Sequence, residues 1–149
     1  MFNRKFWLAI LFICLTSGAF AAADWETDYA KALARAKAEN KRVFLDFTGS
    51  DWCGPCIELR KRVLSSKEFA AYAAKNLVLV EIDYPQRKKQ SAELKKQNEQ
   101  LSHQYGIDEK GFPTIVVLDS NGKVVREFTG YSGEVSADVI AWIEGTKKM

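Results

Sequence analysis

Two cysteines, Cys53 and Cys56, stand two residues apart where a short apolar segment passes into a segment with a helical pattern. The apolar run 43–47 is bounded by polar residues on both sides, which is typical of a buried strand. Apolar residues then recur at helical spacing after Cys56. A strand that runs directly into a Cys-x-x-Cys unit and a helix limits the folds that this chain can adopt, because the first cysteine must open the helix.

The remaining chain alternates between strand patterns and helix patterns. Helices are predicted over 25–40, 57–74 with a bend near Ser65, 86–104 and around 135–143. Buried strands are predicted at 77–82 and 114–118, and the turn 119–122 returns the chain as a hairpin arm over 123–128. This alternation is typical of an α/β domain, and the length of 149 residues fits one domain.

The N-terminus has the three parts of a secretory signal peptide. Arg4 and Lys5 precede an apolar run over 6–15, and Ala19-Phe20-Ala21 matches the small-x-small cleavage pattern. We therefore expect a signal peptide at 1–21, a mature domain at 22–149, and a periplasmic or secreted protein. The alternative is a retained anchor, although the run is shorter than the roughly 20 apolar residues of a spanning helix. Cys14 lies in this segment and is expected to be removed with it.

The charge of the mature domain excludes a broad nucleic-acid surface. Without Arg4 and Lys5 the chain has 20 basic and 19 acidic residues, a formal charge of +1. Nucleic-acid binding needs a concentrated basic face. A structural zinc site is a poor alternative for the cysteine pair, because Cys53, Cys56 and His103 supply at most three of four ligands. We expect no metal.

The spacing of Cys53 and Cys56 favours redox chemistry. A disulfide between them closes a very small ring and constrains the unfolded chain little, although a purely structural disulfide remains an alternative. At the helix N-terminus, the pKa of Cys53 is expected to fall from about 8.5 into the range of about 3.5–7.5. Cys56 lies one turn later and can resolve a mixed disulfide. Pro55 suits the first helical turn, and Gly54 leaves the sulfur uncrowded.

Two motifs resemble the thioredoxin superfamily. Trp52-Cys53-Gly54-Pro55-Cys56 resembles its active-site motif, and Gly111-Phe112-Pro113-Thr114 resembles its cis-proline loop. The similarity extends from about Val43 to the C-terminus, and the run Asp46–Cys53 resembles secreted bacterial thioredoxin-like proteins more than cytosolic thioredoxin. The resemblance implies a thioredoxin fold, an α/β architecture in which helices flank a central mixed β-sheet.

The resemblance also implies roles for individual residues. Cys53 and Cys56 would be catalytic, and Asp46 would move the proton of Cys56. Seven positions separate Asp46 from Cys53 where the family pattern has six, so the alternative for Asp46 is an ordinary strand carboxylate paired to solvent or a neighbour. The substrate contacts implied are Trp52, Gly54, Pro55, the Phe112 backbone, and Pro113 in a cis peptide bond.

The function implied is that of a thiol:disulfide oxidoreductase of the cell envelope. Gly-Pro between the cysteines resembles the reducing members, so we expect a reductase for disulfide-containing exported proteins. It would be monomeric, need no cofactor, and receive electrons from a membrane-embedded donor of the DsbD type. The alternatives are a disulfide-forming oxidase or isomerase, and a binding or chaperone module with a non-catalytic disulfide.

The charged stretch 86–104 contains a basic cluster whose function the sequence leaves open. We interpret the cluster as the solvent-exposed face of a helix, and a docking surface is the alternative. Its members are Arg87, Lys88, Lys89, Lys95 and Lys96.

Overall fold

The computed structural model describes residues 23–149. The proposed signal peptide at 1–21, its possible retention as an anchor, and Cys14 lie outside the described residues. Within 23–149, no helix combines the length and the apolar character that crossing a membrane requires.

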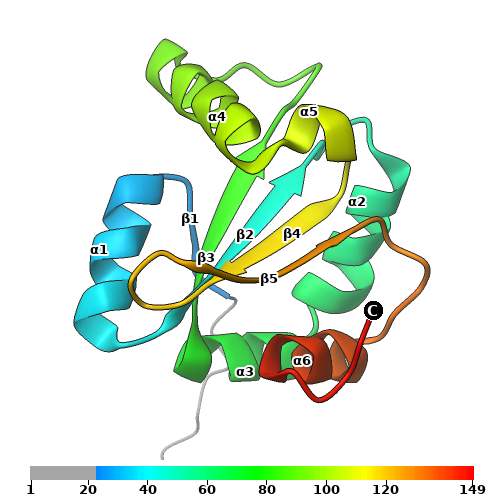
Figure 1. Cartoon of the computed structure of the whole chain (residues 1–149). Helices are drawn as coiled ribbons and strands as arrows, with labels where there is room; N and C mark the ends of the chain where they lie inside the picture. The colour runs from blue at the N-terminus through cyan, green and yellow to red at the C-terminus, as the bar shows by residue number, and fades with distance from the viewer. Residues whose placement is uncertain (1–22) are drawn as a thin grey trace, which may run out of the picture.

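A five-stranded mixed sheet forms the centre of the described chain (Figure 1), in the order β1-β3-β2-β4-β5. The central strands are β2 (Arg42–Thr48), β3 (Leu77–Asp83) and β4 (Thr114–Leu118), and β1 (Trp25–Glu26) and β5 (Val124–Thr129) form the edges. β1 and β2 run parallel to β3, whereas β4 runs antiparallel to β2 and β5. The central strands are almost continuously apolar because helices cover both of their faces.

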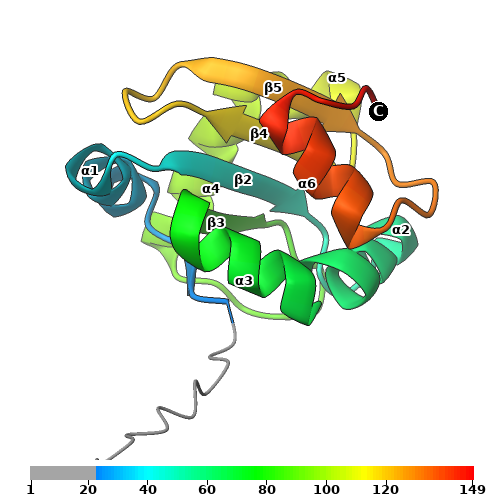
Figure 2. The same ribbon diagram turned by 90° about the horizontal axis from the view of Figure 1, so that it is seen from below.

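The helices form two layers, one on each face of the sheet (Figure 2). One core cluster joins the sheet to α1, α4 and α5, and the other joins it to α2, α3, α6 and a π-helical turn. The first layer comprises α1 (Tyr29–Glu39), α4 (Ala92–Tyr105) and α5 (Ile107–Lys110). The second comprises α2 (Gly54–Leu59), the π-helical turn Arg60–Leu64, α3 (Lys67–Asn76) and α6 (Ser136–Glu144).

Side-chain alternation along β2 divides the core between these layers. Val43, Leu45 and Phe47 point to the α1 side, and Phe44 points to the α2 side. The Phe44 ring makes an edge-to-face contact with Phe69, at a centroid distance of 5.4 Å. Because Asp46 and Thr48 follow Phe44 at intervals of two, they lie on the α2 face as well.

The predicted mixed sheet flanked by helices is confirmed, as are the three buried strands, the hairpin and the final helix. The predicted bend near Ser65 is also present, since the π-helical turn ends there. The next helix begins after Ser66, whose hydroxyl accepts the N–H of Phe69 at 3.1 Å.

The predicted start of the first helix at Trp25 is wrong. Trp25 lies in the edge strand β1, where it pairs with Leu79 of β3. The helix begins only at Tyr29, because Asp28 caps it by accepting the N–H of Lys31 at 2.9 Å.

The predicted helix over 86–104 also begins too early. Residues 84–91 form a loop, and α4 starts at Ala92 with Ser91 as its N-cap. The backbone N–H groups of Gln86, Arg87 and Lys88 bind the Asp51 carboxylate, which holds this segment against the cysteine turn as a loop. Part of the basic cluster therefore lies on a loop rather than on a helical face.

Candidate active site

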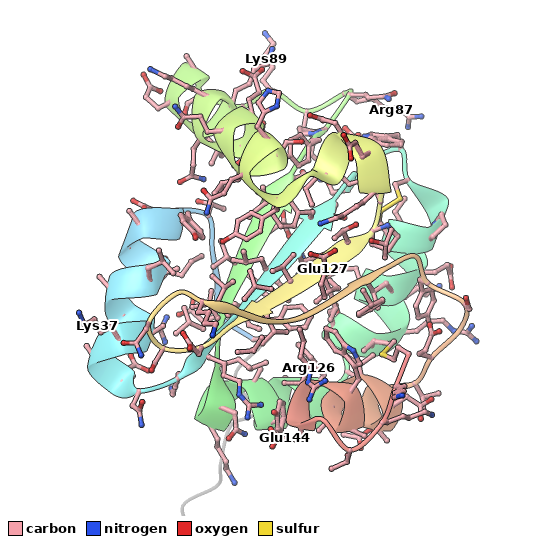
Figure 3. All side chains as sticks on the ribbon, viewed as in Figure 1. Lys37, Arg87, Lys89, Arg126, Glu127 and Glu144 are labelled. Carbon is pink, nitrogen blue, oxygen red and sulfur yellow. A yellow bond between two sulfur atoms is a disulfide. The ribbon has the colours of Figure 1, made fainter. Side chains whose placement is uncertain are left out.

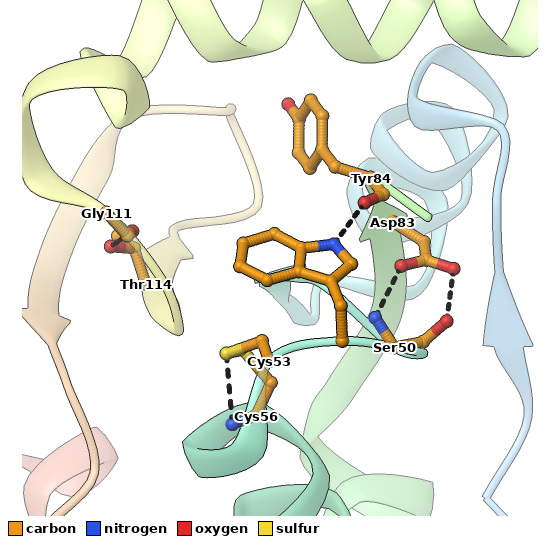
Figure 4. The surroundings of a disulfide bond; sticks show 8 residues. Ser50, Cys53, Cys56, Asp83, Tyr84, Gly111 and Thr114 are labelled. Atoms are coloured by element: carbon orange, nitrogen blue, oxygen red, sulfur yellow. Dashed lines mark hydrogen bonds between the residues drawn. A yellow bond between two sulfur atoms is a disulfide. The ribbon is translucent and has the colours of Figure 1, made fainter. Parts of the chain in front are cut away.

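The turn after β2 places Cys53 at the start of α2. Cys53 is the N-cap of this helix, and its Sγ accepts the N–H of Cys56 at 3.3 Å (Figure 4). The two residues form a disulfide. Both cysteines are buried, because Cys53 is 6% exposed and Cys56 is 3% exposed. Pro55 fits this position because the first turn of a helix needs no donor from its backbone nitrogen.

Asp83 at the end of β3 holds the turn from the neighbouring strand. Its two carboxylate oxygens accept the N–H and the hydroxyl of Ser50, at 2.8 and 2.6 Å (Figure 4). The parallel register brings the ends of β2 and β3 together, with Thr48 beside Asp83. The turn that carries Cys53 is therefore fixed by contacts from outside its own segment.

Asp51 ties the same turn to the loop that follows β3. Its carboxylate accepts the N–H groups of Gln86, Arg87 and Lys88 at 2.9, 2.8 and 3.0 Å. These backbone hydrogen bonds, the one from Gln86 above all, hold the pKa of Asp51 below its usual value. Asp51 thus remains ionised at neutral pH, and the loop stays attached to the cysteine turn.

Trp52 covers the turn with its indole ring. Its Nε1 donates to the carbonyl of Tyr84 at 2.7 Å, and its ring meets Phe112 edge to face at 5.6 Å. Gly49 lies directly beneath, so close that a Cβ at this position would stand 2.4 Å from the indole. Trp52 remains 38% exposed next to the disulfide.

The loop before β4 lies opposite the disulfide, where Figure 4 labels Gly111 and Thr114. The Phe112–Pro113 peptide bond is cis, as the resemblance implied. Within residues 23–149 the backbone of Phe112 makes no hydrogen bond. Its N–H and C=O groups are therefore free to bind an extended peptide.

Gly54 and Pro55 occupy the first two positions of α2 and are exposed. An added Cβ at Gly54 would meet no heavy atom within 4 Å. The approach to the sulfurs past these two residues is open.

Asp46 is buried in the sheet, with 2% exposure, on the face that α2 covers. Its Oδ2 accepts a hydrogen bond from the Arg60 guanidinium at 3.3 Å. The same guanidinium binds Glu81, which lies beside Asp46 on β3, and covers the Trp25 ring at 4.0 Å. One cation therefore serves two neighbouring carboxylates.

Burial raises the pKa of Asp46 to about 7. The Arg60 guanidinium opposes this shift, whereas the Glu81 and Asp83 carboxylates add to it. The other oxygen, Oδ1, is buried without a hydrogen-bond partner in the described part of the chain. Asp46 can therefore take up and release a proton near neutral pH, and Oδ1 is the oxygen available to carry it.

A cavity of about 200 Å³ opens beside Cys56. Thr48, Ser50, Ile57, Arg60 and Lys61 complete its lining. Arg60 therefore lines the cavity beside Cys56 and also binds the buried Asp46 carboxyl group.

The sequence predicted roles for the residues of the two motifs and for Asp46, and it missed the residues that hold these groups in place. The structure brings Trp52 and Phe112 into contact near the disulfide and places Asp46 on the α2 face. The missed residues are Gly49, Asp51, Arg60, Glu81 and Asp83. Only Gly49 and Asp51 carried a sequence signal, their position next to the motif. In residues 23–149 no group of three or more His, Cys, Asp or Glu side chains could hold a metal ion.

Comparison with known proteins gives consistent matches. A family model for thioredoxin-like proteins matches residues 24–120. The chain is 42% identical over 105 residues to the disulfide bond reductase DsbH of Chlamydia pneumoniae, covering 70% of this chain and 61% of that protein. It is 29% identical over 140 residues to the thioredoxin-related protein DsbJ of the same organism, and this match covers 89% of this chain and 40% of DsbJ. The chain thus spans less than two thirds of the length of either relative.

A solved structure of a DsbH oxidoreductase superposes on the chain with a TM-score of 0.77 at 35% sequence identity. The match covers 85% of each of the two chains. The predicted thioredoxin fold is therefore confirmed.

Replacing Asp46 by Asn is expected to flatten the pH dependence of stability between about pH 4 and 7. The folded chain holds the Asp46 proton up to a pKa of about 7, whereas the ordinary pKa of an aspartate side chain is 3.8. The free energy of unfolding of the wild type therefore falls as the pH rises through this window, by up to about 1.4 kcal/mol per pH unit from this group. Urea unfolding of the oxidised protein at several pH values measures the slope. Asp108→Asn, an exposed control, should keep the wild-type slope, and equal slopes for all three proteins would refute the prediction.

Replacing Gly49 by Ala is expected to displace the Trp52 indole, because the new Cβ would stand 2.4 Å from it. We expect a loss of about 1–3 kcal/mol in the free energy of unfolding and a changed near-ultraviolet circular dichroism spectrum. Gly54→Ala is the matched control, since its Cβ meets nothing within 4 Å, and it should be no less stable than the wild type. Equal stability of the two variants would show that the indole does not rest on Gly49.

Proposed function

Because this chain belongs to the thioredoxin-like family, we propose that it is a thiol:disulfide oxidoreductase that reduces disulfides of exported proteins. The observation that carries the proposal is the Cys53–Cys56 disulfide, formed at the N-cap of α2 beside the exposed Trp52 ring. A cysteine pair in this position can exchange between disulfide and dithiol while the helix stays in place. The similarity to proteins named as disulfide reductase and oxidoreductase supports the same activity.

In the first step, the reduced protein attacks its substrate through Cys53. The Cys53 thiolate forms a bond to one sulfur of the substrate disulfide, and the other substrate sulfur leaves as a thiolate that takes a proton. The helix N-terminus favours the attacking anion through its unpaired N–H groups and dipole. The N–H of Cys56, which points at Cys53 Sγ, is one of these groups.

In the second step, Cys56 attacks Cys53 Sγ and releases the second substrate sulfur. The protein is left with the intramolecular disulfide, and the substrate has gained two electrons and two protons. We assign to Asp46 the acceptance of the Cys56 proton, because its pKa of about 7 suits proton transfer near neutral pH. The cavity beside Cys56 is lined by Arg60, which binds Asp46, and a water molecule in this cavity would carry the proton from one group toward the other.

We assign substrate contacts to the surface around the sulfurs. An extended substrate segment can pair with the free backbone groups of Phe112 in the manner of an added strand. Trp52 offers it an apolar face, and Pro113 withholds a competing N–H group. Gly54 and Pro55 leave the sulfur accessible from the remaining side.

We also propose where the protein acts and which class of protein reduces it. Residues 1–21 would direct the chain to the cell envelope, where the protein must be reduced again after each turnover. A membrane-embedded donor of the DsbD type would supply the two electrons.

The reduction potential tests the direction of the reaction. We expect a value near the roughly −270 mV of thioredoxin, since the cysteines enclose Gly54 and Pro55 as in reducing members of the superfamily. Equilibration with glutathione or dithiothreitol redox buffers, followed by alkylation of free thiols, measures it. A potential near about −120 mV would instead identify an oxidase.

Trapping tests the chemistry itself. Cys56→Ala is expected to accumulate mixed disulfides with envelope proteins, because the covalent complex at Cys53 can no longer be resolved. The variant is expressed with its own N-terminus, and complexes are separated on non-reducing gels. The double variant Cys53→Ala/Cys56→Ala is the control and should trap nothing. A folded Cys56→Ala protein that captures no more than the double variant would contradict the proposed function.

A further inference from the structure

A cleft of about 410 Å³ lies between the loop after β3 and the start of α4, and it is basic. Three lysines line it against a single glutamate, with Tyr84 and Asn98 among the other lining residues. We name it the basic cleft, and its charged residues are Lys88, Lys89, Lys95 and Glu99. Figure 3 shows Lys89 and neighbouring Arg87 at the same end of the molecule, away from Lys37.

The positive charge of the basic cleft is largely unneutralised. Among residues 23–149, neither Lys88 nor Lys89 forms an ion pair, and Lys95 meets Glu99 only at 4.0 Å with both side chains exposed. Arg87, which precedes Lys88 in the same loop, has no ion pair within this range either, and the acidic group that its charge acts on is Asp51. Exposed lysines without partners attract anions at little desolvation cost.

The basic cleft is fixed relative to the disulfide. Asp51, two residues before Cys53, binds three backbone N–H groups of the loop. Lys88 Nζ also donates to the Ser50 hydroxyl at 3.2 Å. The side-chain N–H groups of Gln90 and Asn98 also donate to the backbone carbonyl of Asp83, each at 2.9 Å.

An aromatic surface connects the sulfurs with the basic cleft. Trp52 directly precedes Cys53, and its indole N–H donates to the Tyr84 carbonyl at 2.7 Å. Tyr84 in turn lines the basic cleft and contacts the Phe112 ring at 5.2 Å. A peptide that reacts at Cys53 and extends over Trp52 and Tyr84 would therefore run toward the lysines.

We propose that the basic cleft binds a carboxylate-rich segment of the substrate protein, close in sequence to the disulfide that Cys53 attacks. This inference rests on the proposed function and names the substrate class. Ammonium groups on separate flexible stems suit scattered carboxylates. A lipid surface fits less well, because the exposed loop residues Gln86 to Lys89 offer no apolar side chain for insertion.

Competition between matched substrates tests the proposal. Two disulfide peptides of equal length carry either a Glu/Asp cluster or a Lys cluster beside the same disulfide, and hydroxyethyl disulfide serves as a small neutral substrate. We expect the wild type to reduce the acidic peptide with a kcat/KM about 10-fold above that of the basic peptide at low salt. The preference should shrink as NaCl is raised, because salt screens exposed charges.

The variant Lys89→Glu/Lys95→Glu is expected to abolish or invert this preference. It keeps Lys88 and its hydrogen bond to Ser50, so the cysteine turn is not altered. The control Lys37→Glu/Lys75→Glu makes the same change in net charge on α1 and α3 and should keep the wild-type preference. Circular dichroism checks that both variants fold.

The outcomes separate this inference from the proposed function. If the wild type reduces both peptides equally, or if both variants change the preference alike, the inference is overturned while the reductase activity stands. If the wild type reduces none of the three substrates, the proposed function fails. Loss of binding to phosphatidylglycerol vesicles in Lys89→Glu/Lys95→Glu, with unchanged peptide preference, would assign the basic cleft to a membrane and overturn the inference.

Discussion

The position of Cys53 depends on two carboxylates that bridge the turns after β2 and β3. Asp83 holds Ser50 from the end of β3, and Asp51 holds the loop after β3 from the cysteine turn. Hydrogen bonds to ionised carboxylates are stronger than those between neutral groups. The parallel register of the two strands brings both partners to one edge of the sheet. The disulfide, the aromatic surface and the basic cleft therefore form one unit.

Local patterns predicted the elements whose own residues decide their structure. The apolar runs that became β2, β3 and β4 can only be buried, so their positions followed from the sequence. The predicted element boundaries were wrong where contacts with residues distant in the sequence determine the structure. Trp25 fits a helical spacing with Tyr29, yet it pairs with Leu79, more than fifty residues away. The loop before α4 is held by Asp51, which lies 35 residues before Gln86 and appears in no local pattern.

The candidate site also combines residues that lie in local motifs with residues that only distant contacts bring together. Cys53, Cys56, Trp52 and the Phe112–Pro113 bond lie in two contiguous motifs, so the resemblance to the thioredoxin superfamily was enough to propose them as site residues. The arrangement of Arg60 between Asp46 and Glu81 needs the β2–β3 register and the direction of α2 at once. The additional residue between Asp46 and Cys53 does not move the carboxyl group out of the core. Two adjacent acidic groups are tolerated there because one guanidinium contacts both.

The attachment of the loop after β3 has an evolutionary consequence. Asp51 binds peptide nitrogens at three successive positions, and every residue except proline supplies such a nitrogen. The side chains at Gln86 and Arg87 can thus be exchanged for others without loosening the loop. Related chains could acquire new partner preferences through these positions while the sulfur chemistry stays untouched.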